Sequence, residues 1–103
     1  MAITDSPKLY RAPETRIIGN RAVRVTDVCV HTFVLGDVED PDLYAAQPLY
    51  AWQQSAAGQW VMEHAVETPY WLRDADPLTL GSRYQIRARL TDQDHTFWKM
   101  KFT

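Results

Sequence analysis

The stretch Pro48–Ala65, Pro-Leu-Tyr-Ala-Trp-Gln-Gln-Ser-Ala-Ala-Gly-Gln-Trp-Val-Met-Glu-His-Ala, decides the fold because its large apolar residues recur at the period of an α-helix. Leu49, Trp52 and Trp60 lie on one side of that helix. Two tryptophans on one helical face present a large apolar area, which a small domain covers most economically with a sheet. We therefore predict one main helix here, with Trp52 and Trp60 facing a β-sheet.

Prolines and a glycine predict the details of this helix. Pro48 suits its first turn, where the missing N–H of proline is not needed. Gly58 marks either a kink or a place where another part of the backbone comes close. Upstream, Pro41 disfavours the right-handed helical conformation for Asp40, so residues 37–42 read as an acidic turn.

The remaining segments predict an antiparallel sheet. The predicted strands are residues 15–18, 23–35, 67–73, 84–91 and 95–102. The long second strand is apolar at both parities and should be central, whereas Pro69 cannot donate to a ladder and indicates an edge strand. The last two strands should form a hairpin. The predicted fold class is α+β, with one main helix and a mostly antiparallel sheet of four or five strands in two layers.

The domain organisation follows from the length and from the first residues. A chain of 103 residues is one domain, which we place at residues 14–103. Residues 1–13 are mostly polar, contain two prolines and show no period, so they read as an extended arm. Leu9 and Tyr10 interrupt this polar arm and are candidates for docking on a neighbouring surface.

Composition and charge exclude several classes of protein. Eleven basic against thirteen acidic residues give a net charge of −2, which favours neither a DNA-binding protein nor a nucleic-acid mimic. The single cysteine cannot form an intramolecular disulfide. No apolar run approaches the ~18 residues of a membrane span. We expect a cytoplasmic protein that does not interact with membranes.

The residues that carry chemistry do not form a recognisable catalytic or metal motif. His31, His64 and His95 lack the spacing of metal ligands, and no serine or cysteine has an identifiable basic partner. The acidic turn lacks the alternating ligands and the distal glutamate of an EF-hand loop. We predict a protein that is not an enzyme and that has no metal or cofactor.

The outer face of the predicted hairpin is a candidate nucleic-acid-binding surface. Cationic and aromatic side chains on an open sheet can contact phosphates and stack on bases of a single strand. The residues of this face are Arg87, Arg89, Phe97, Lys99 and Lys101. A solvated sheet face protected by its cations explains the same pattern. Single-stranded nucleic-acid binding is therefore our second functional hypothesis.

The surplus of aromatic residues favours a protein interface. Four tryptophans and five tyrosines exceed what one small core needs, and exposed aromatics that cluster are typical of interfaces. The candidate interface residues are Leu9, Tyr10, Tyr44, Met62 and Trp71. Our first hypothesis is a protein-interaction or structural subunit that binds a protein partner or assembles as a homo-oligomer.

Two segments resemble small proteins encoded by tailed phages. They are Gly-Asp-Val-Glu-Asp-Pro-Asp-Leu-Tyr-Ala-Ala-Gln-Pro-Leu-Tyr at residues 36–50 and Gly-Gln-Trp-Val-Met-Glu-His at residues 58–64, together with the aromatic and basic residues of the C-terminal segment. The resemblance covers most of the chain after Val28 and brings no catalytic motif. It implies a virion subunit or an accessory protein, located in the virion or in the cytoplasm of the host cell.

Overall fold

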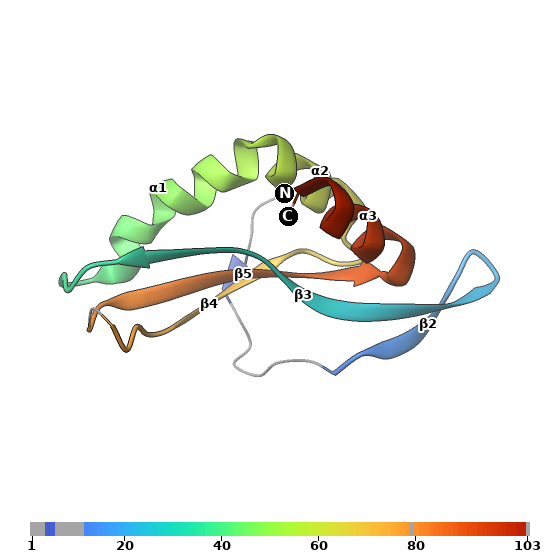
Figure 1. The fold of residues 1–103 in the computed structure, drawn as a ribbon, viewed down its shortest axis with the longest axis horizontal. Helices are drawn as coiled ribbons and strands as arrows, with labels where there is room; N and C mark the ends of the chain where they lie inside the picture. The colour runs from blue at the N-terminus through green and yellow to red at the C-terminus, as the bar shows by residue number, and fades with distance from the viewer. Residues whose placement is uncertain (1–3, 6–11, 79, 103) are drawn as a thin grey trace.

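The protein has an α+β fold in a computed structural model that describes residues 4, 5, 12–78 and 80–102. The elements are β1 (Thr4–Asp5), β2 (Glu14–Ile18), β3 (Arg21–Leu35), α1 (Pro41–Gln54), α2 (Ala56–His64), β4 (Tyr70–Ala75), β5 (Ser82–Thr91) and α3 (Asp92–Phe102). Figure 1 shows these three helices on the same side of the sheet. The prediction of an α+β class is confirmed.

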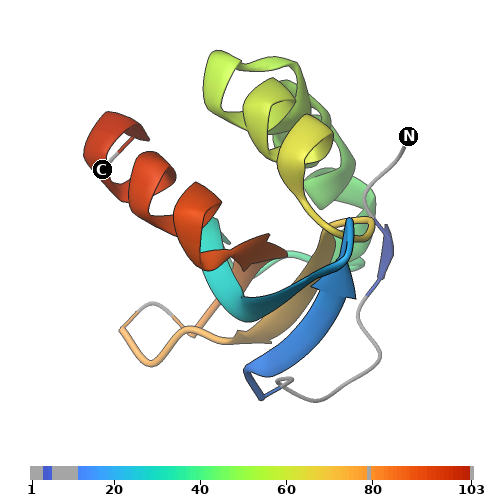
Figure 2. The ribbon, with the colours of Figure 1, turned by 90° about the vertical axis from the view of Figure 1, so that its right-hand side faces the viewer.

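The described strands form one curled sheet in the order β1-β4-β5-β3-β2. All neighbours are antiparallel except the two-residue β1, which runs parallel to β4. The long strand β3 lies between β5 and β2, as its apolar residues at both parities predicted. The sheet bends around its helical side (Figure 2), and the chain from Arg21 to Arg24 extends beyond the part of β3 that pairs with β5.

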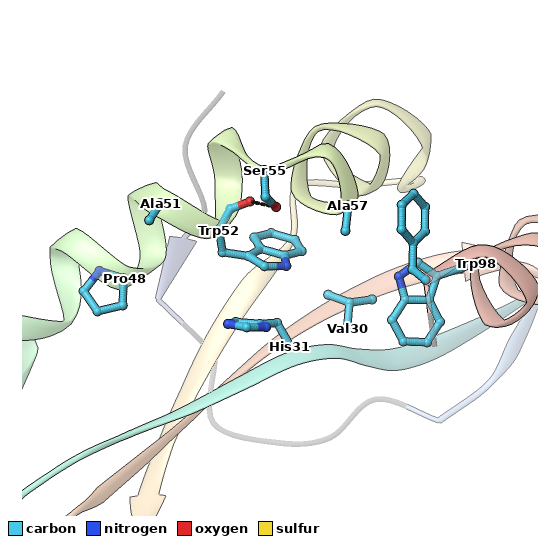
Figure 3. A pocket seen from close by; sticks show the side chains of 9 residues that line it. Val30, His31, Pro48, Ala51, Trp52, Ser55, Ala57 and Trp98 are labelled. Atoms are coloured by element: carbon cyan, nitrogen blue, oxygen red, sulfur yellow. Dashed lines mark hydrogen bonds between the residues drawn. The ribbon is translucent and has the colours of Figure 1, made fainter.

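A β-bulge at Val30 changes which side chains of β3 face the helices. Cys29 lies opposite Arg87 and His31 lies opposite Ile86, so Val30 has no residue of β5 across from it. Figure 3 shows Val30 and His31 both directed toward the helices. The bulge therefore supplies two consecutive side chains to the region under α1 and α2.

The prediction of one main helix over residues 48–65 is wrong in its boundaries. Helix α1 begins at Pro41, directly after Asp40, whose left-handed backbone (φ 50°, ψ 58°) agrees with its predicted exclusion from the right-handed helix. Pro48 lies inside α1 and not in the first turn of a helix. The helical chain is interrupted at Ser55, which is extended and begins α2.

Ser55 stabilises this interruption with its side chain. Its Oγ accepts a hydrogen bond from the backbone N–H of Gly58 at 3.0 Å and donates to the carbonyl of Trp52 at 2.5 Å. The first bond caps one of the N–H groups that the start of a helix leaves without a partner. α1 and α2 are therefore two separate helices that meet at Ser55.

The predicted hairpin over residues 84–102 is wrong in its second half. β5 has the expected alternation, but the chain then forms α3 instead of returning as a strand. The hydroxyl of Thr91 accepts a hydrogen bond from the N–H of Asp94 at 3.2 Å, which caps the start of α3. Trp98 and Phe102, one turn apart, then pack against the core.

The core lies between the helices and the sheet. Its buried residues are Val28, Val30, Trp52, Val61, Ile86, Ala88, Leu90 and Trp98. Trp52 is buried, and Trp60 is half-buried and packs against the same cluster. Both tryptophans face inward as predicted. The ring of Trp60 also stacks on His64, with ring centroids 4.3 Å apart.

Candidate functional site

The outer surface of α1 is the candidate site, and we call it the α1 face. It consists of Leu43, Tyr44, Gln47, Tyr50 and Gln54, all of which are exposed. Residues 43–62 contain no charged side chain, although charged residues make up 23% of the chain. A helix surface in contact with water ordinarily carries charges opposite its apolar stripe. The α1 face carries none.

The periodicity of α1 explains why these side chains point outward. Ala45 and Trp52, seven residues apart, are buried, and Leu49 between them packs against the core. The opposite positions of the helix therefore face water. Asp42, the charged residue at the start of α1, is occupied within the chain, because it accepts hydrogen bonds from Arg73 at 3.0 Å and from the Tyr84 hydroxyl at 2.6 Å.

Large apolar side chains dominate the α1 face. Leu43 is 73% exposed, Tyr50 64% and Tyr44 58%. The centres of protein interfaces are depleted in charged residues and enriched in tyrosine, and the α1 face has this composition. A surface of this kind can exclude water against another protein, since no charge has to be desolvated.

The other predicted interface residues do not join Tyr44 on one surface. Met62 and Trp71 are half-buried and pack against the core cluster, and Trp71 contacts the ring of Tyr84 with centroids 5.5 Å apart. Leu9 and Tyr10 lie outside the described residues. Sequence reasoning missed Leu43 and Tyr50. The signal that would have found them is the length of the uncharged run.

The five residues predicted to bind nucleic acid do not share a surface. Arg87 and Arg89 lie on β5, and their side chains are on the sheet face away from the helices. Arg89 is only 1% exposed. Phe97, Lys99 and Lys101 lie on α3, where the Lys101 ammonium is 5.8 Å from the centre of the Phe97 ring. The predicted common face is wrong because residues 92–102 are helical.

A buried charge cluster explains the position of the two arginines. The side chain of Asp27 is fully buried and accepts a hydrogen bond from Arg87 at 2.8 Å. The hydroxyl of Tyr70 donates a second hydrogen bond to the same carboxylate. Arg89 donates to Glu14 at 2.8 Å and to the carbonyl of Ala12 at 3.3 Å. Burial, followed by the bond to Asp27, raises the pKa of Tyr70 to about 12. These bonds link β2, β3, β4 and β5, although Nε and Nη1 of Arg89 are buried without a hydrogen bond to any described residue.

A cleft of about 550 Å³ lies between α1, α2, α3 and the bulge of β3. Figure 3 shows the indole of Trp52 over the imidazole of His31, and their ring centroids are 6.1 Å apart. Burial lowers the pKa of His31, which favours the neutral form of its imidazole. The indole N–H of Trp98, on the opposite wall, is buried and makes no hydrogen bond within the described part of the chain. Among the described residues, those that line the cleft include no carboxylate or thiol.

Metal-ligating side chains do not gather in the described structure. Residues 12–78 and 80–102 contain no group of three or more His, Cys, Asp or Glu side chains placed to hold a metal ion. The imidazole of His64 has a hydrogen-bond partner in its own helix, because its Nδ1 lies 2.8 Å from the carbonyl oxygen of Trp60. None of the described helices has the length and apolar character needed to cross a membrane.

Comparison of the chain with known protein families, with curated protein sequences and with solved structures finds no match.

Proposed function

We propose that the protein is a non-enzymatic structural subunit of a homo-oligomer, whose copies meet through the α1 face. The observation that carries the proposal is an exposed helix surface with Leu43, Tyr44 and Tyr50 and without charge. The resemblance to small tailed-phage proteins suggests a virion or an accessory complex as the setting, in the virion or in the host cytoplasm. The proposal involves no cofactor and no membrane.

The energetics favour contact between two identical faces. Fully burying a leucine or an aromatic side chain contributes about 1.5–3 kcal/mol. A two-fold contact presses the same surface of both copies together, so a face that carried charges of one sign would meet charges of that same sign. The α1 face avoids that repulsion because residues 43–62 are uncharged. Its affinity should therefore depend little on salt.

The finer features predicted from the sequence belong to this proposal. The domain of residues 14–103 has its helices in one layer and its sheet in the other, which leaves the outer side of α1 free for a partner. Residues 1–13 act as an arm. Within the same chain, Thr4–Asp5 add a short parallel strand to β4, which is the kind of contact by which an arm can dock on the edge of a sheet.

The test is a charge placed on the α1 face. We expect the wild-type chain to sediment above its monomer mass of 11.9 kDa at about 1 M salt, where the Debye length is about 3 Å and charge contacts are screened. The double variant Leu43→Glu with Tyr50→Glu should be a monomer under the same conditions. Introduced carboxylates repel across a two-fold contact and must be desolvated.

A matched control places the same charges elsewhere. Gln93 and Thr96 are exposed on α3, so Gln93→Glu with Thr96→Glu changes the net charge equally without touching α1. This control should keep the wild-type mass. A wild-type chain that stays at 11.9 kDa at every concentration, or an equal loss of mass in both double variants, would refute the proposal.

Single-stranded nucleic-acid binding remains the second hypothesis, now with less support. Arg87 and Arg89 are paired with carboxylates in the charge cluster, which leaves Phe97, Lys99 and Lys101 on α3. If these three residues act together, Lys99→Ser with Lys101→Ser should weaken binding of a labelled oligonucleotide in fluorescence anisotropy. Binding that is unchanged in this variant, or that does not fall with salt, would reject the hypothesis.

A further inference from the structure

The two ends of the long axis of the molecule carry opposite charges. The described chain extends 48 × 27 × 24 Å. One end is the turn between β2 and β3, and the other holds the loop after β3 and the loop between β4 and β5 (Figure 1). We define the basic end as Ile17, Ile18, Arg21 and Arg24, and the acidic end as Asp37, Val38, Glu39, Asp40, Leu78 and Leu80.

The arginines of the basic end differ from the other described arginines. Five arginines are paired with carboxylates of the same chain: Arg16, Arg73, Arg83, Arg87 and Arg89. Arg21 and Arg24 are exposed and make no ion pair with any described residue. Their charges are therefore available to a partner.

The acidic end shows the complementary pattern. Asp37, Glu39 and Asp40 are exposed and form no ion pair within the described ranges 12–78 and 80–102. Asp42, two residues further along, is already paired with Arg73. Like charges crowded in one loop repel one another, so a cationic partner lowers their energy.

Exposed apolar side chains accompany the charges at both ends. Ile17 is 75% exposed beside the arginines of the hairpin, and Leu78 is 91% exposed at the opposite end. The hairpin reaches past β5, because Arg21–Arg24 pair with β2 and have no partner in β5. A two-stranded ribbon gains stability when another surface covers it.

We infer that the basic end of one copy docks on the acidic end of the next copy. The inference rests on the proposed function of an assembly subunit and names a second contact, made by residues outside the α1 face. A single chain carries both complementary surfaces, so a second copy is the partner that satisfies both. Such a head-to-tail contact produces a ring where the rotation closes and a filament where it does not.

Charge reversal at each end tests the inference. The first variant is Arg21→Glu with Arg24→Glu, and the second is Asp37→Lys with Glu39→Lys. At about 0.01 M salt, where the Debye length is about 30 Å, the wild-type chain should sediment as larger species than at about 1 M salt. Each variant alone carries charges of the same sign at both ends, so the ends repel one another. We expect each variant to need at least tenfold higher concentration than the wild type to form the larger species.

An equimolar mixture of the two variants supplies the decisive control. The reversed hairpin of the first variant then meets the reversed loop of the second, and the two unchanged ends also match, so the large species should return. Recovery in the mixture also shows that both variants are folded. Variants that associate like the wild type, a mixture that does not recover, or a wild-type mass independent of salt would overturn the inference.

The outcome separates this inference from the proposed function. Association at about 1 M salt that is lost in the Leu43→Glu, Tyr50→Glu variant supports the α1 contact alone. Association at about 0.01 M salt that is lost in the charge-reversed variants, and recovered in their mixture, supports the end-to-end contact alone. A monomer under both conditions rejects both contacts.

Discussion

At Gly58 the end of α1 comes closer to α2 than any side chain permits. A Cβ atom at this position would lie 1.8 Å from the carbonyl oxygen of Trp52 and 2.7 Å from its carbon. Both are backbone atoms, which cannot move aside as a flexible side chain can. The close approach expected from this glycine is confirmed, whereas the helix break itself lies at Ser55.

Gly58→Ala should therefore destabilise the protein, even though alanine is the better helix former. We expect a loss of about 2–4 kcal/mol in the free energy of unfolding, because α1 and α2 must separate to admit the methyl group. Gly36→Ala is the control, since a Cβ there meets nothing within 4 Å. Urea unfolding followed by tryptophan fluorescence measures both. Equal stability of the two variants would contradict the observed packing.

Tyr70 gives the protein a pH-dependent stability in the alkaline range. Its pKa is raised to about 12 in the fold, above the value of about 10 for an unfolded chain. Between these values the unfolded chain has lost the proton and the folded chain has kept it. The contribution of Tyr70 to the free energy of unfolding is therefore fully present below about pH 10 and is lost as the pH rises toward 12. Burial and the bond to Asp42 have the same effect on Tyr84.

Tyr70→Phe should reduce this alkaline loss by ~2 kcal/mol, leaving the part that belongs to Tyr84. The variant should also be less stable at pH 7 by about 1–3 kcal/mol, because Asp27 loses one of its donors. Urea unfolding at several pH values between about 8 and 12 checks both statements. An alkaline slope equal to that of the wild type would show that Tyr70 is not the group that titrates.

Among the elements, α3 shows where the sequence misleads and why. Residues 95–102 alternate as a strand would, but Trp98 and Phe102 are also one helical turn apart. The deciding signal was local: Thr91 three residues before Asp94 is the pattern of a helix cap, and the structure contains that bond. Period alone could not choose between the two interpretations in so short a segment.

Thr91→Ala should destabilise the protein by ~1 kcal/mol, because the N–H of Asp94 loses its acceptor at the start of α3. Thr91→Ser keeps the hydroxyl and should retain most of the stability. Thermal unfolding followed by circular dichroism compares the two variants. If alanine and serine are equivalent at this position, the cap does not stabilise α3.

Other elements were predictable in part. The inward positions of Trp52 and Trp60 and the central place of β3 followed from apolar periodicity, which reports burial directly. The bulge at Val30 could not be predicted from periodicity, because an extra residue in one strand is recognised only from its register with the partner strand. Residues 41–47 were not predicted as part of the main helix, since Pro48 was assigned to the helix start.

At the scale of the whole molecule, the sheet has a different character on each side. One face packs against the helices, and the other holds the buried side chains of Asp27 and Arg89 beside the half-buried Arg87. The alternation of apolar and polar residues along β5 correctly predicted that Arg87 and Arg89 lie on the other face of the sheet from Ile86 and Ala88. It also implied, wrongly, that this outer face is exposed to solvent throughout. Burial of Arg89 depends on Glu14 and Ala12, which are distant in sequence, so a local pattern could not reveal it.

The same limit applies to the candidate site. The uncharged run of residues 43–62 is visible in the sequence, but which of its side chains face water depends on how α1 lies on the sheet. Tyr44 was predicted correctly as exposed. The sequence predicts Met62 and Trp71 at an interface because it indicates no place for them inside a two-layer domain, yet both pack against the core cluster.

Hydroxyl-radical footprinting of tyrosines tests the α1 contact most directly. Tyr44 and Tyr50 are exposed on the α1 face, whereas Tyr70 and Tyr84 are buried and serve as internal references. Our account predicts that oxidation of Tyr44 and Tyr50 falls severalfold between dilute and concentrated protein, while the two buried tyrosines stay protected throughout. Unchanged oxidation of Tyr44 and Tyr50 in a sample whose mass has risen above 11.9 kDa would contradict it.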